Sequence, residues 1–385
     1  MRDNWTRYHV SPSISRQPRF SARPSKSTWG SIAKFHWKVI LILLLMSGTI
    51  EICLQDAAAH RELFTAQEKE QLKTAERIEL VAVALTDQGT ADASGIASTV
   101  TARFAGLGYR VVIDPTQPHD VTVKVKCEEH KVWEGTVTSG GDADQLDSAS
   151  RLWKGPACQI TYRIPQHGTD WRHEVRTDPG KNPTGIEAIS QLTRRLADDP
   201  FPILLAGAWG HSPRLIKLLE NPSTIQSQKI IVISLLGNMF AVEAIPILSR
   251  TLKEKDPAVA RSAALALGAI GQEDCIPLLQ ELLKHESPDL RRAAIKGLGR
   301  LAPLYPSSDI VPTLLAQLSH EPLDVQTEIV RALGKTTDQR ILEPLRALNR
   351  SVQEKSRSDS SPELKELKRA LGQSLDQFDE IHGGE

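Results

Sequence analysis

Two histidine–glutamate pairs are the residues in this chain whose types and spacing could do chemistry. They are His285-Glu286 and His320-Glu321, and they stand 35 residues apart. Imidazole nitrogens and carboxylate oxygens are common ligands of transition metals, and in a repeated structure two such pairs could face each other across neighbouring turns. Both pairs fall in loops before helices, however, whereas a metal site needs ligands on rigid elements. We therefore interpret these candidate metal ligands as solvated loop residues, and we expect no cofactor.

The chain lacks the motifs of the common catalytic and nucleotide-binding sites. It has no P-loop, no G-x-S-x-G, no H-E-x-x-H and no G-x-G-x-x-G. His173-Glu174 stands beside Trp171 on a predicted strand, an arrangement more typical of an exposed strand edge than of an active site. Because no nucleophile with a neighbouring base can be named, we expect a protein that is not an enzyme.

The elements that carry these residues form a repeat. The segment DPAVARSAALALGAIG, residues 256–271, returns as SPDLRRAAIKGLGRLA, residues 287–302. A shift of 31 residues keeps every apolar position of this helix and of the helix before it apolar or small. A fixed period of this size is the mark of a solenoid of stacked helix pairs. The apolar positions of one unit are Ile245, Leu248, Leu252, Val259, Ala263, Ala266, Leu267 and Ile270.

Helix boundaries recur with the same period. Asp256-Pro257 and Ser287-Pro288 each place an oxygen-bearing side chain before a proline, which predicts an N-cap followed by the first helical residue. A glycine also recurs near the end of each second helix, although glycine costs a helix about 1 kcal/mol relative to alanine. This recurrence predicts that each second helix approaches the next repeat closely. The glycines are Gly237, Gly268, Gly299, Gly334 and Gly372.

Residues 213–385 resemble HEAT repeats of the short type related to phycobilin lyases. The resemblance is carried by AIPILSRTLKEKDPAVARSAALALGAIG and CIPLLQELLKHESPDLRRAAIKGLGRL, and it implies an all-α solenoid of about five helix pairs. The family includes enzymes, among them deoxyhypusine hydroxylase, which binds two irons through His-Glu pairs at the start of each second helix. The matching positions here hold Arg261-Ser262, Arg291-Arg292 and Thr327-Glu328. A lyase role would need a chromophore pocket, which the sequence cannot reveal.

Basic residues recur on the second helices, away from the apolar face. Lys296, Arg331 and Arg369 each stand three residues before a repeat glycine, and Arg261 and Arg292 stand seven residues before one. The second helices of HEAT arrays tend to line the concave side, so these five residues predict a surface for a protein partner, and their charge favours an acidic one. The alternative is an ordinary solvated face, because acids also lie nearby: Asp289, Glu328 and Glu366.

A different pattern precedes the repeats. Residues 77–85 and 120–128 read as strands, 94–108 and 184–197 as helices, and 157–164 with 170–177 as a hairpin. This order predicts a small α+β domain over residues 76–200. The stretch 133–150 reads as a surface loop. Cys127 and Cys158 stand in two of the strand-like runs and could form a disulfide in an oxidising compartment.

The N-terminal region indicates export. Lys+Arg and Asp+Glu balance at 47 each over the 385 residues, which favours no nucleic-acid partner. Residues 1–38 nevertheless carry eight basic residues and one acid, and an uncharged apolar run, VILILLLMSGTI, follows. This layout is typical of a secretory signal or of a short membrane anchor within residues 39–54. Either the true start lies downstream or the segment stays uncleaved.

These observations predict a non-enzymatic scaffold of a bacterial cell envelope, periplasmic or anchored in the inner membrane, that binds a protein through its solenoid. The alternatives are a lyase-like or metal-dependent HEAT enzyme, and a spacer whose middle domain docks on an envelope component. The expected organisation is a basic disordered segment (1–38), a signal or anchor (39–59), a linker or helix (60–75), the α+β domain (76–200) and the solenoid (201–385).

Overall fold

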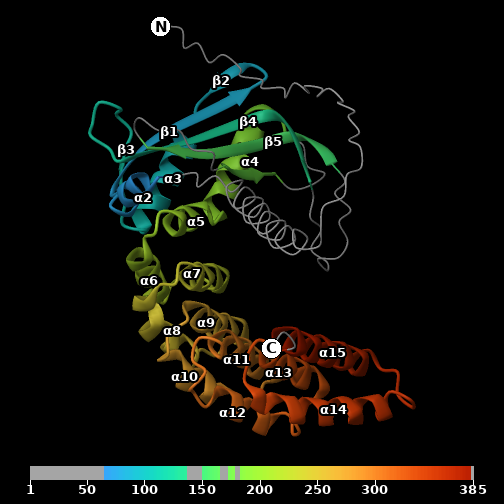
Figure 1. Cartoon of the computed structure of the whole chain (residues 1–385). Coiled ribbons are helices and arrows are strands. Elements are labelled where there is room, and N and C mark those ends of the chain that lie inside the picture. Colours follow the sequence, from blue (N-terminus) through green and yellow to red (C-terminus); the bar gives the residue numbers. More distant parts are fainter. Residues whose placement is uncertain (1–64, 137–149, 165–171, 178–182, 383–385) are drawn as a thin grey trace, which may run out of the picture. The chain divides into compact units, whose positions relative to one another are not determined.

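The computed structural model describes residues 65–136, 150–164, 172–177 and 183–382. The predicted basic segment, residues 1–38, and the predicted export segment, residues 39–59, lie outside these ranges and stay predictions. No helix within the described ranges is both long enough and apolar enough to cross a membrane. The described chain consists of a mixed sheet with helices, followed by a helical repeat region (Figure 1).

The first part is a sheet in the order β2-β1-β4-β5-β6, with β3 beside β1. Strand β1 runs parallel to β3 and β4, whereas the pairs β1–β2, β4–β5 and β5–β6 are antiparallel. The elements are α2 (Ala66–Lys73), β1 (Arg77–Thr86), β2 (Gly89–Ala91), α3 (Ser94–Gly106), β3 (Arg110–Val112), β4 (Val121–Thr136), β5 (Ser150–Arg163), β6 (Arg172–Arg176) and α4 (Gly185–Asp198).

Alternation along the strands decides which face of the sheet the helices cover. Val121, Val123 and Val125 on β4 are almost fully buried, while Lys124 between them is exposed. The buried side chains of α3 and α4 join the same core, and Figure 1 shows both helices against one face of the sheet. The period-2 pattern in the sequence therefore marks a strand with one covered face.

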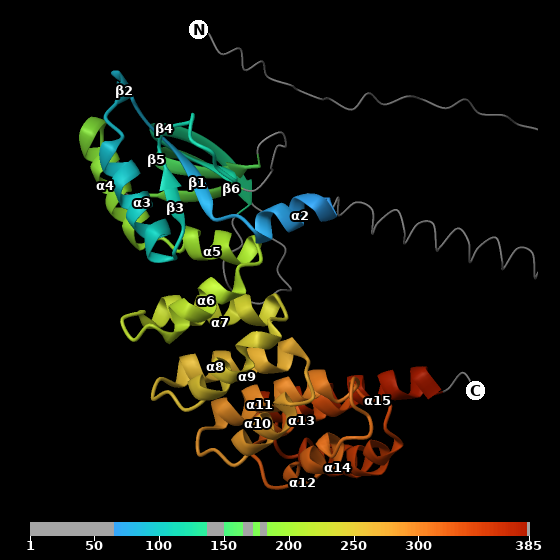
Figure 2. The same cartoon turned by 90° about the vertical axis from the view of Figure 1, so that its left-hand side faces the viewer.

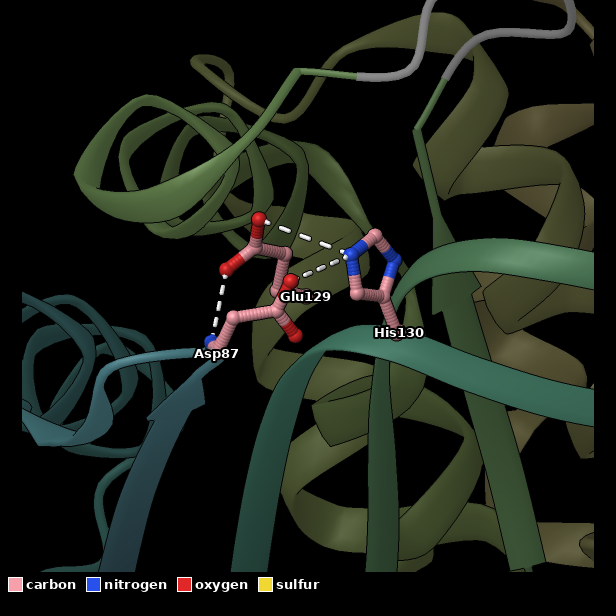
Figure 3. A group of neighbouring side chains, drawn as sticks. All are labelled: Asp87, Glu129 and His130. Carbon is pink, nitrogen blue, oxygen red and sulfur yellow. Dashed lines mark hydrogen bonds and ion pairs between the residues drawn. The ribbon is translucent and has the colours of Figure 1, made fainter.

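Helix α4 begins beside a bulge in β4. The pairing of β4 with β5 shifts register between Glu128 and Lys131, and this irregularity directs the buried Glu129 toward the turn between β1 and β2 and toward α4 (Figure 3). The Glu129 carboxylate accepts hydrogen bonds from the backbone N–H groups of Asp87 and Gly185. Thr184, the residue before α4, makes no side-chain cap, so Glu129 supplies the cap from another element.

The surface loop predicted for residues 133–150 is too long at both ends. Strand β4 continues to Thr136 and β5 begins at Ser150, with Trp133 opposite Trp153 and Thr136 opposite Ser150. The polar and glycine-rich residues of this stretch concealed the ends of the two strands, because they carry no alternating apolar pattern. Residues 137–149, the middle of the predicted loop, lie outside the described ranges.

Five helix pairs follow α5 (Phe201–Ala208), as the repeat pattern predicts. Figure 2 shows the second helices stacked in sequence order. The first helices of the pairs are α6 (Ser212–Glu220), α8 (Ile245–Thr251), α10 (Cys275–Leu282), α12 (Ile310–Gln317) and α14 (Leu342–Lys355). The second helices are α7 (Gln226–Asn238), α9 (Pro257–Ile270), α11 (Pro288–Leu301), α13 (Leu323–Leu333) and α15 (Pro362–His382). Short 3-10 helices, η1 (Val242–Ala244) and η2 (Gln339–Ile341), precede α8 and α14.

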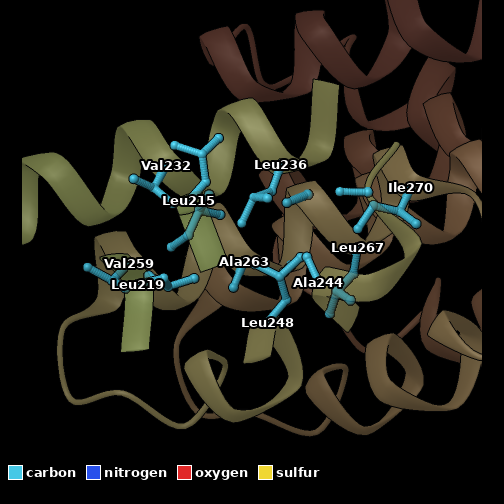
Figure 4. Close-up of a cluster of buried hydrophobic side chains, with 14 of the residues drawn as sticks. Leu215, Leu219, Val232, Leu236, Ala244, Leu248, Val259, Ala263, Leu267 and Ile270 are labelled. Atoms are coloured by element: carbon cyan, nitrogen blue, oxygen red, sulfur yellow. The ribbon is translucent and has the colours of Figure 1, made fainter. Parts of the chain in front are cut away.

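The apolar face read from the repeat is the core of the array. Leu248 of α8 and Val259, Ala263 and Leu267 of α9 are almost fully buried, and they pack with residues of α6 and α7 (Figure 4). Asp256 caps α9 as predicted, because its carboxylate accepts from Ala258 N–H and Val259 N–H. The equivalent prediction for Ser287 is wrong. Its side chain makes no cap, and its N–H donates to His285 Nδ1 at 3.0 Å.

The repeat glycines mark close contacts between successive second helices, as predicted. A Cβ on Gly237 would lie 2.9 Å from the Cα of Ala266, and one on Gly299 would lie 2.9 Å from the Cα of Ala332. A Cβ on Gly334 would likewise overlap the side chain of Ser374 on α15. A Cβ on Gly372, on α15, would meet nothing within 4 Å, since no described helix stacks against it at this point. Each of the other glycines thus makes room for the second helix of the following repeat.

One apolar core continues from the sheet region into the first repeats. The Trp209 ring, almost fully buried, meets Tyr109 at 5.7 Å and Tyr162 at 5.4 Å between ring centroids, both edge to face. Leu72 of α2, in the stretch expected to be a linker or helix, is buried in this core. Both ring nitrogens of His211 form hydrogen bonds. Nδ1 lies 2.5 Å from the Tyr109 hydroxyl, and Nε2 lies 2.8 Å from the Leu72 carbonyl oxygen.

Candidate binding groove

The second helices of the last four repeats line a groove. Its volume is about 530 Å³, and each of α9, α11, α13 and α15 contributes side chains. Most of these side chains are exposed or half-buried, whereas Ala293 and Thr327 at the base of the groove are buried. The lining residues are Arg261, Ser262, Leu265, Asp289, Arg292, Ala293, Lys296, Asp324, Thr327, Glu328, Arg331, Pro362, Glu363 and Glu366.

The groove collects four of the five basic residues that the sequence singled out. Arg261, Arg292, Lys296 and Arg331 line it, from α9, α11 and α13. Arg369 does not line it. The Arg369 guanidinium donates to Glu366 at 2.9 Å one turn earlier on α15. Counting back from the repeat glycines therefore selected basic residues that line one groove on α9, α11 and α13, but not on α15, where Arg369 lies outside it.

Most of these cations are paired with acids on the next helix. Arg292 Nη1 lies 2.5 Å from Asp324 Oδ2, and Arg292 also pairs with Asp289 on its own helix. Lys296 Nζ lies 3.5 Å from Glu328 Oε2. The pairs join α11 to α13 across the groove wall.

The same arrangement joins α13 to α15. Arg331 Nη1 lies 2.7 Å from Glu328 Oε1, and Arg331 also pairs with Glu366. Five acidic side chains accompany the four basic ones in the groove lining. The expectation of an acidic partner rested on a column of cations, and the structure corrects that column to a mixed one. Asp289, Glu328 and Glu366 were noted in the sequence, whereas Asp324 and Glu363 were not.

The histidine–glutamate pairs do not form a metal site within the described residues. Glu321 is bound by Arg291, whose Nη2 lies 2.8 Å from Glu321 Oε2, and His285 Nδ1 accepts from the Ser287 N–H. The carbonyl of Glu286 accepts from the same arginine at 2.9 Å. Glu321 and Glu286 therefore hold the loop before α11 to the loop before α13. His320 belongs to no group of three ligand side chains among the described residues.

One group of potential metal ligands was missed by the sequence reasoning. The ligand atoms of Asp87, Glu129 and His130 all lie within 4.8 Å of one another (Figure 3). His130 Nε2 lies 3.0 Å from Asp87 Oδ2 and 3.7 Å from Glu129 Oε1. The backbone N–H groups of Asp87 and Gly185 lower the pKa of Glu129, so its carboxylate is ionised. The contacts assign Glu129 the role of a cap, and Asp87 and His130 are exposed.

The two remaining pairs named from the sequence lie in the sheet. Cys127 and Cys158 stand opposite each other on β4 and β5 and are joined by a disulfide, while Cys275 is free and buried. His173 is on β6, an edge strand as expected, and its Nε2 lies 2.8 Å from Asp199 Oδ1. Glu174 lies 3.1 Å from Lys131 Nζ on β4. Both side chains of the His173-Glu174 pair thus have structural partners.

Comparison with known proteins identifies the repeats. Two overlapping stretches, residues 212–294 and 276–360, match the family model of HEAT repeats. No curated protein sequence matches the chain. Among solved structures, an engineered protein is 19% identical, with a TM-score of 0.36 over 47% of this chain and 85% of that one.

Two natural proteins are similar at the same level. The complex of CpcE and CpcF of phycocyanin lyase from a Nostoc species is 18% identical, with a TM-score of 0.32 over 45% of this chain and 67% of that one. Human deoxyhypusine hydroxylase in complex with glycerol is 18% identical, with a TM-score of 0.25 over 51% and 86%. The family match, together with the stacked and glycine-marked helix pairs, identifies residues 212–360 as HEAT repeats.

Proposed function

We propose that this chain is a non-enzymatic adaptor that holds a segment of another protein in the groove of α9, α11, α13 and α15. The observation that carries the proposal is the groove itself: four successive repeats contribute polar and charged side chains to one continuous surface. Such a surface suits an elongated partner, because a stacked array offers equivalent positions at regular spacing. The core contacts of the same helices explain the repeat pattern, so the groove residues are the part of each repeat left for recognition.

Export to the cell envelope is the second part of the proposal. The basic and apolar residues of the N-terminal region support it, and so does the pairing of Cys127 with Cys158, since disulfides persist in oxidising compartments. Sequencing the N-terminus of the mature protein distinguishes a cleaved signal from an anchor. Recovery of the whole protein with reduced thiols in the cytoplasm would contradict export.

Crosslinking in living cells tests the groove. A photoreactive amino acid at position 265 stands inside the groove, whereas one at position 281 stands on an exposed site of α10 outside the groove lining. We expect position 265 to give a discrete adduct with a protein and position 281 to give none. Equal adducts at both positions, or none at position 265, would contradict the proposal.

A separate experiment tests the alternative of a metal-dependent or lyase-like HEAT enzyme. Metal analysis of the purified full-length protein should find no stoichiometric iron or zinc if the adaptor proposal holds. A stoichiometric metal that is lost on replacing His285 and His320, or on replacing Asp87 and His130, would favour the enzyme instead.

A further inference from the structure

The basic residues of α11 and α13 are already used within the protein. Each of Arg292, Lys296 and Arg331 has an acidic partner on the following second helix. A partner protein would have to break these pairs before it could use the charges, and Glu328 is nearly buried between Lys296 and Arg331, at 11% exposure. These pairs therefore act first as bridges between repeats.

Arg261 differs from the other cations of the groove. It is exposed on α9, and it has no hydrogen bond or ion pair with any described residue. One turn later on α9, Leu265 also lines the groove and is half-buried. Leu265 takes the place that lysine or arginine occupies on α11 and α13. The α9 end of the groove thus offers an unpaired guanidinium beside an apolar surface.

The α15 end of the groove has the opposite character. Glu363 is exposed near the start of α15 and makes no ion pair with the described residues. Adjacent helices pack about 8–10 Å apart, so the steps from α9 through α11 and α13 to α15 cover about 24–30 Å. An extended chain rises about 3.3 Å per residue, which corresponds to about seven to nine residues.

We propose that the groove binds an extended protein segment in one direction, with an acidic residue beside an aliphatic residue at the α9 end and a basic residue about seven to nine positions away at the α15 end. The inference rests on the proposed adaptor function and names the partner's chemistry. Arg261 pairs with the carboxylate, Leu265 contacts the aliphatic side chain, and Glu363 pairs with the basic residue. The bridging cations contribute rigidity rather than recognition.

A displayed library of random twelve-residue peptides tests this assignment on the full-length protein. Wild-type protein should enrich peptides with Asp or Glu next to Leu, Ile, Val or Met, and with Lys or Arg seven to nine positions away. Arg261→Glu should replace the acidic preference with a basic one, and Glu363→Lys should reverse the preference at the other end. For one enriched peptide, Arg261→Ala should weaken affinity at least tenfold.

Two controls separate the possible failures. Arg250→Ala removes an exposed arginine of α8 outside the groove lining and should change the affinity of the same peptide less than threefold. Ser262→Trp fills the groove beside Arg261 and should abolish enrichment, with the fold checked by circular dichroism. If wild type and Arg261→Glu enrich the same peptides, the assigned direction is wrong while groove binding stands. If wild type enriches nothing beyond Ser262→Trp, both the direction and the proposed function are wrong.

Discussion

Gly268 of α9 lies against Gly297 of α11 so closely that a Cβ on Gly268 would overlap the Cα of Gly297. The backbones of two successive second helices thus meet directly at this point, next to the groove. Side-chain rotation cannot relieve such an overlap, because the obstructing atom belongs to the main chain. The spacing of the repeats, and with it the spacing of the groove residues, depends on this contact.

Gly268→Ala should therefore destabilise the protein. Overpacking at a well-packed contact costs typically 1–3 kcal/mol, and the better helix propensity of alanine offsets about 1 kcal/mol of it. We expect the free energy of unfolding to fall by about 1 kcal/mol, and by no more than about 2 kcal/mol, in urea titrations. Gly372→Ala is the matched control, since its Cβ would meet nothing within 4 Å. It should raise the free energy of unfolding by up to about 1 kcal/mol, and an equal gain in Gly268→Ala would contradict the contact.

Phe240 should be replaceable by glycine with a gain in stability. It follows α7 with φ of 53°, a left-handed conformation that glycine adopts at the equivalent positions Gly210 and Gly271. The cost for a side-chain-bearing residue is about 1–2 kcal/mol, and the ring is 65% exposed, so little burial offsets it. Phe240→Gly should raise the melting temperature in thermal unfolding. Phe240→Ala removes the same ring but keeps the strain, and a rise equal to that of glycine would exclude the backbone explanation.

The repeat region was readable from the sequence because its core positions recur. The period of 31 residues located Val259, Ala263 and Leu267 on the buried face, and the glycine column predicted the inter-helix contacts. The groove was readable only in part. Its cations could be counted in columns, but their partners stand on the next helix, 32 to 35 residues later for Arg292–Asp324, Lys296–Glu328 and Arg331–Glu366.

The sheet region gave fewer signals because its contacts do not repeat. The three-residue strand β2 was not predicted, since Gly89–Ala91 carries no alternating pattern and forms by pairing with the end of β1. Asp87, Glu129 and His130 come together through a bulge and a turn. Neither feature has a residue spacing that sequence reasoning could recognise.

The Cys127–Cys158 disulfide should contribute substantially to stability. It closes a loop between residues 31 positions apart, for which the loss of unfolded-state entropy corresponds to about 3–4 kcal/mol. Unfolding in urea with and without dithiothreitol measures this difference. A Cys127→Ala/Cys158→Ala variant should show no effect of the reductant, which separates the disulfide from Cys275. Equal urea midpoints for wild type under both conditions would exclude a stabilising disulfide.

His211 should make the folded protein sensitive to mild acid. Its Nε2 donates to the Leu72 carbonyl, which can only accept, so Nδ1 of the neutral ring accepts a hydrogen bond from the Tyr109 hydroxyl. Burial lowers the pKa of His211, and the nearby Arg214 guanidinium lowers it further. The unfolded chain therefore binds a proton near pH 6.5 that the folded chain binds only at lower pH. Stability is full above pH 6.5 and declines as the pH falls toward the folded pKa, by at most about 1.4 kcal/mol for each pH unit.

His211→Gln isolates this contribution, because its amide retains a donor for Leu72 but does not titrate between pH 7 and 5. The other histidines titrate in both proteins, so the difference between the two stability curves reports His211 alone. We expect the free energy of unfolding of the wild type to fall more steeply than that of the variant on acidification. Parallel curves would show that the ring titrates equally in the folded and unfolded chains. A steeper fall in the variant would mean that the folded protein favours the charged ring, which would contradict the lowering of the His211 pKa by burial.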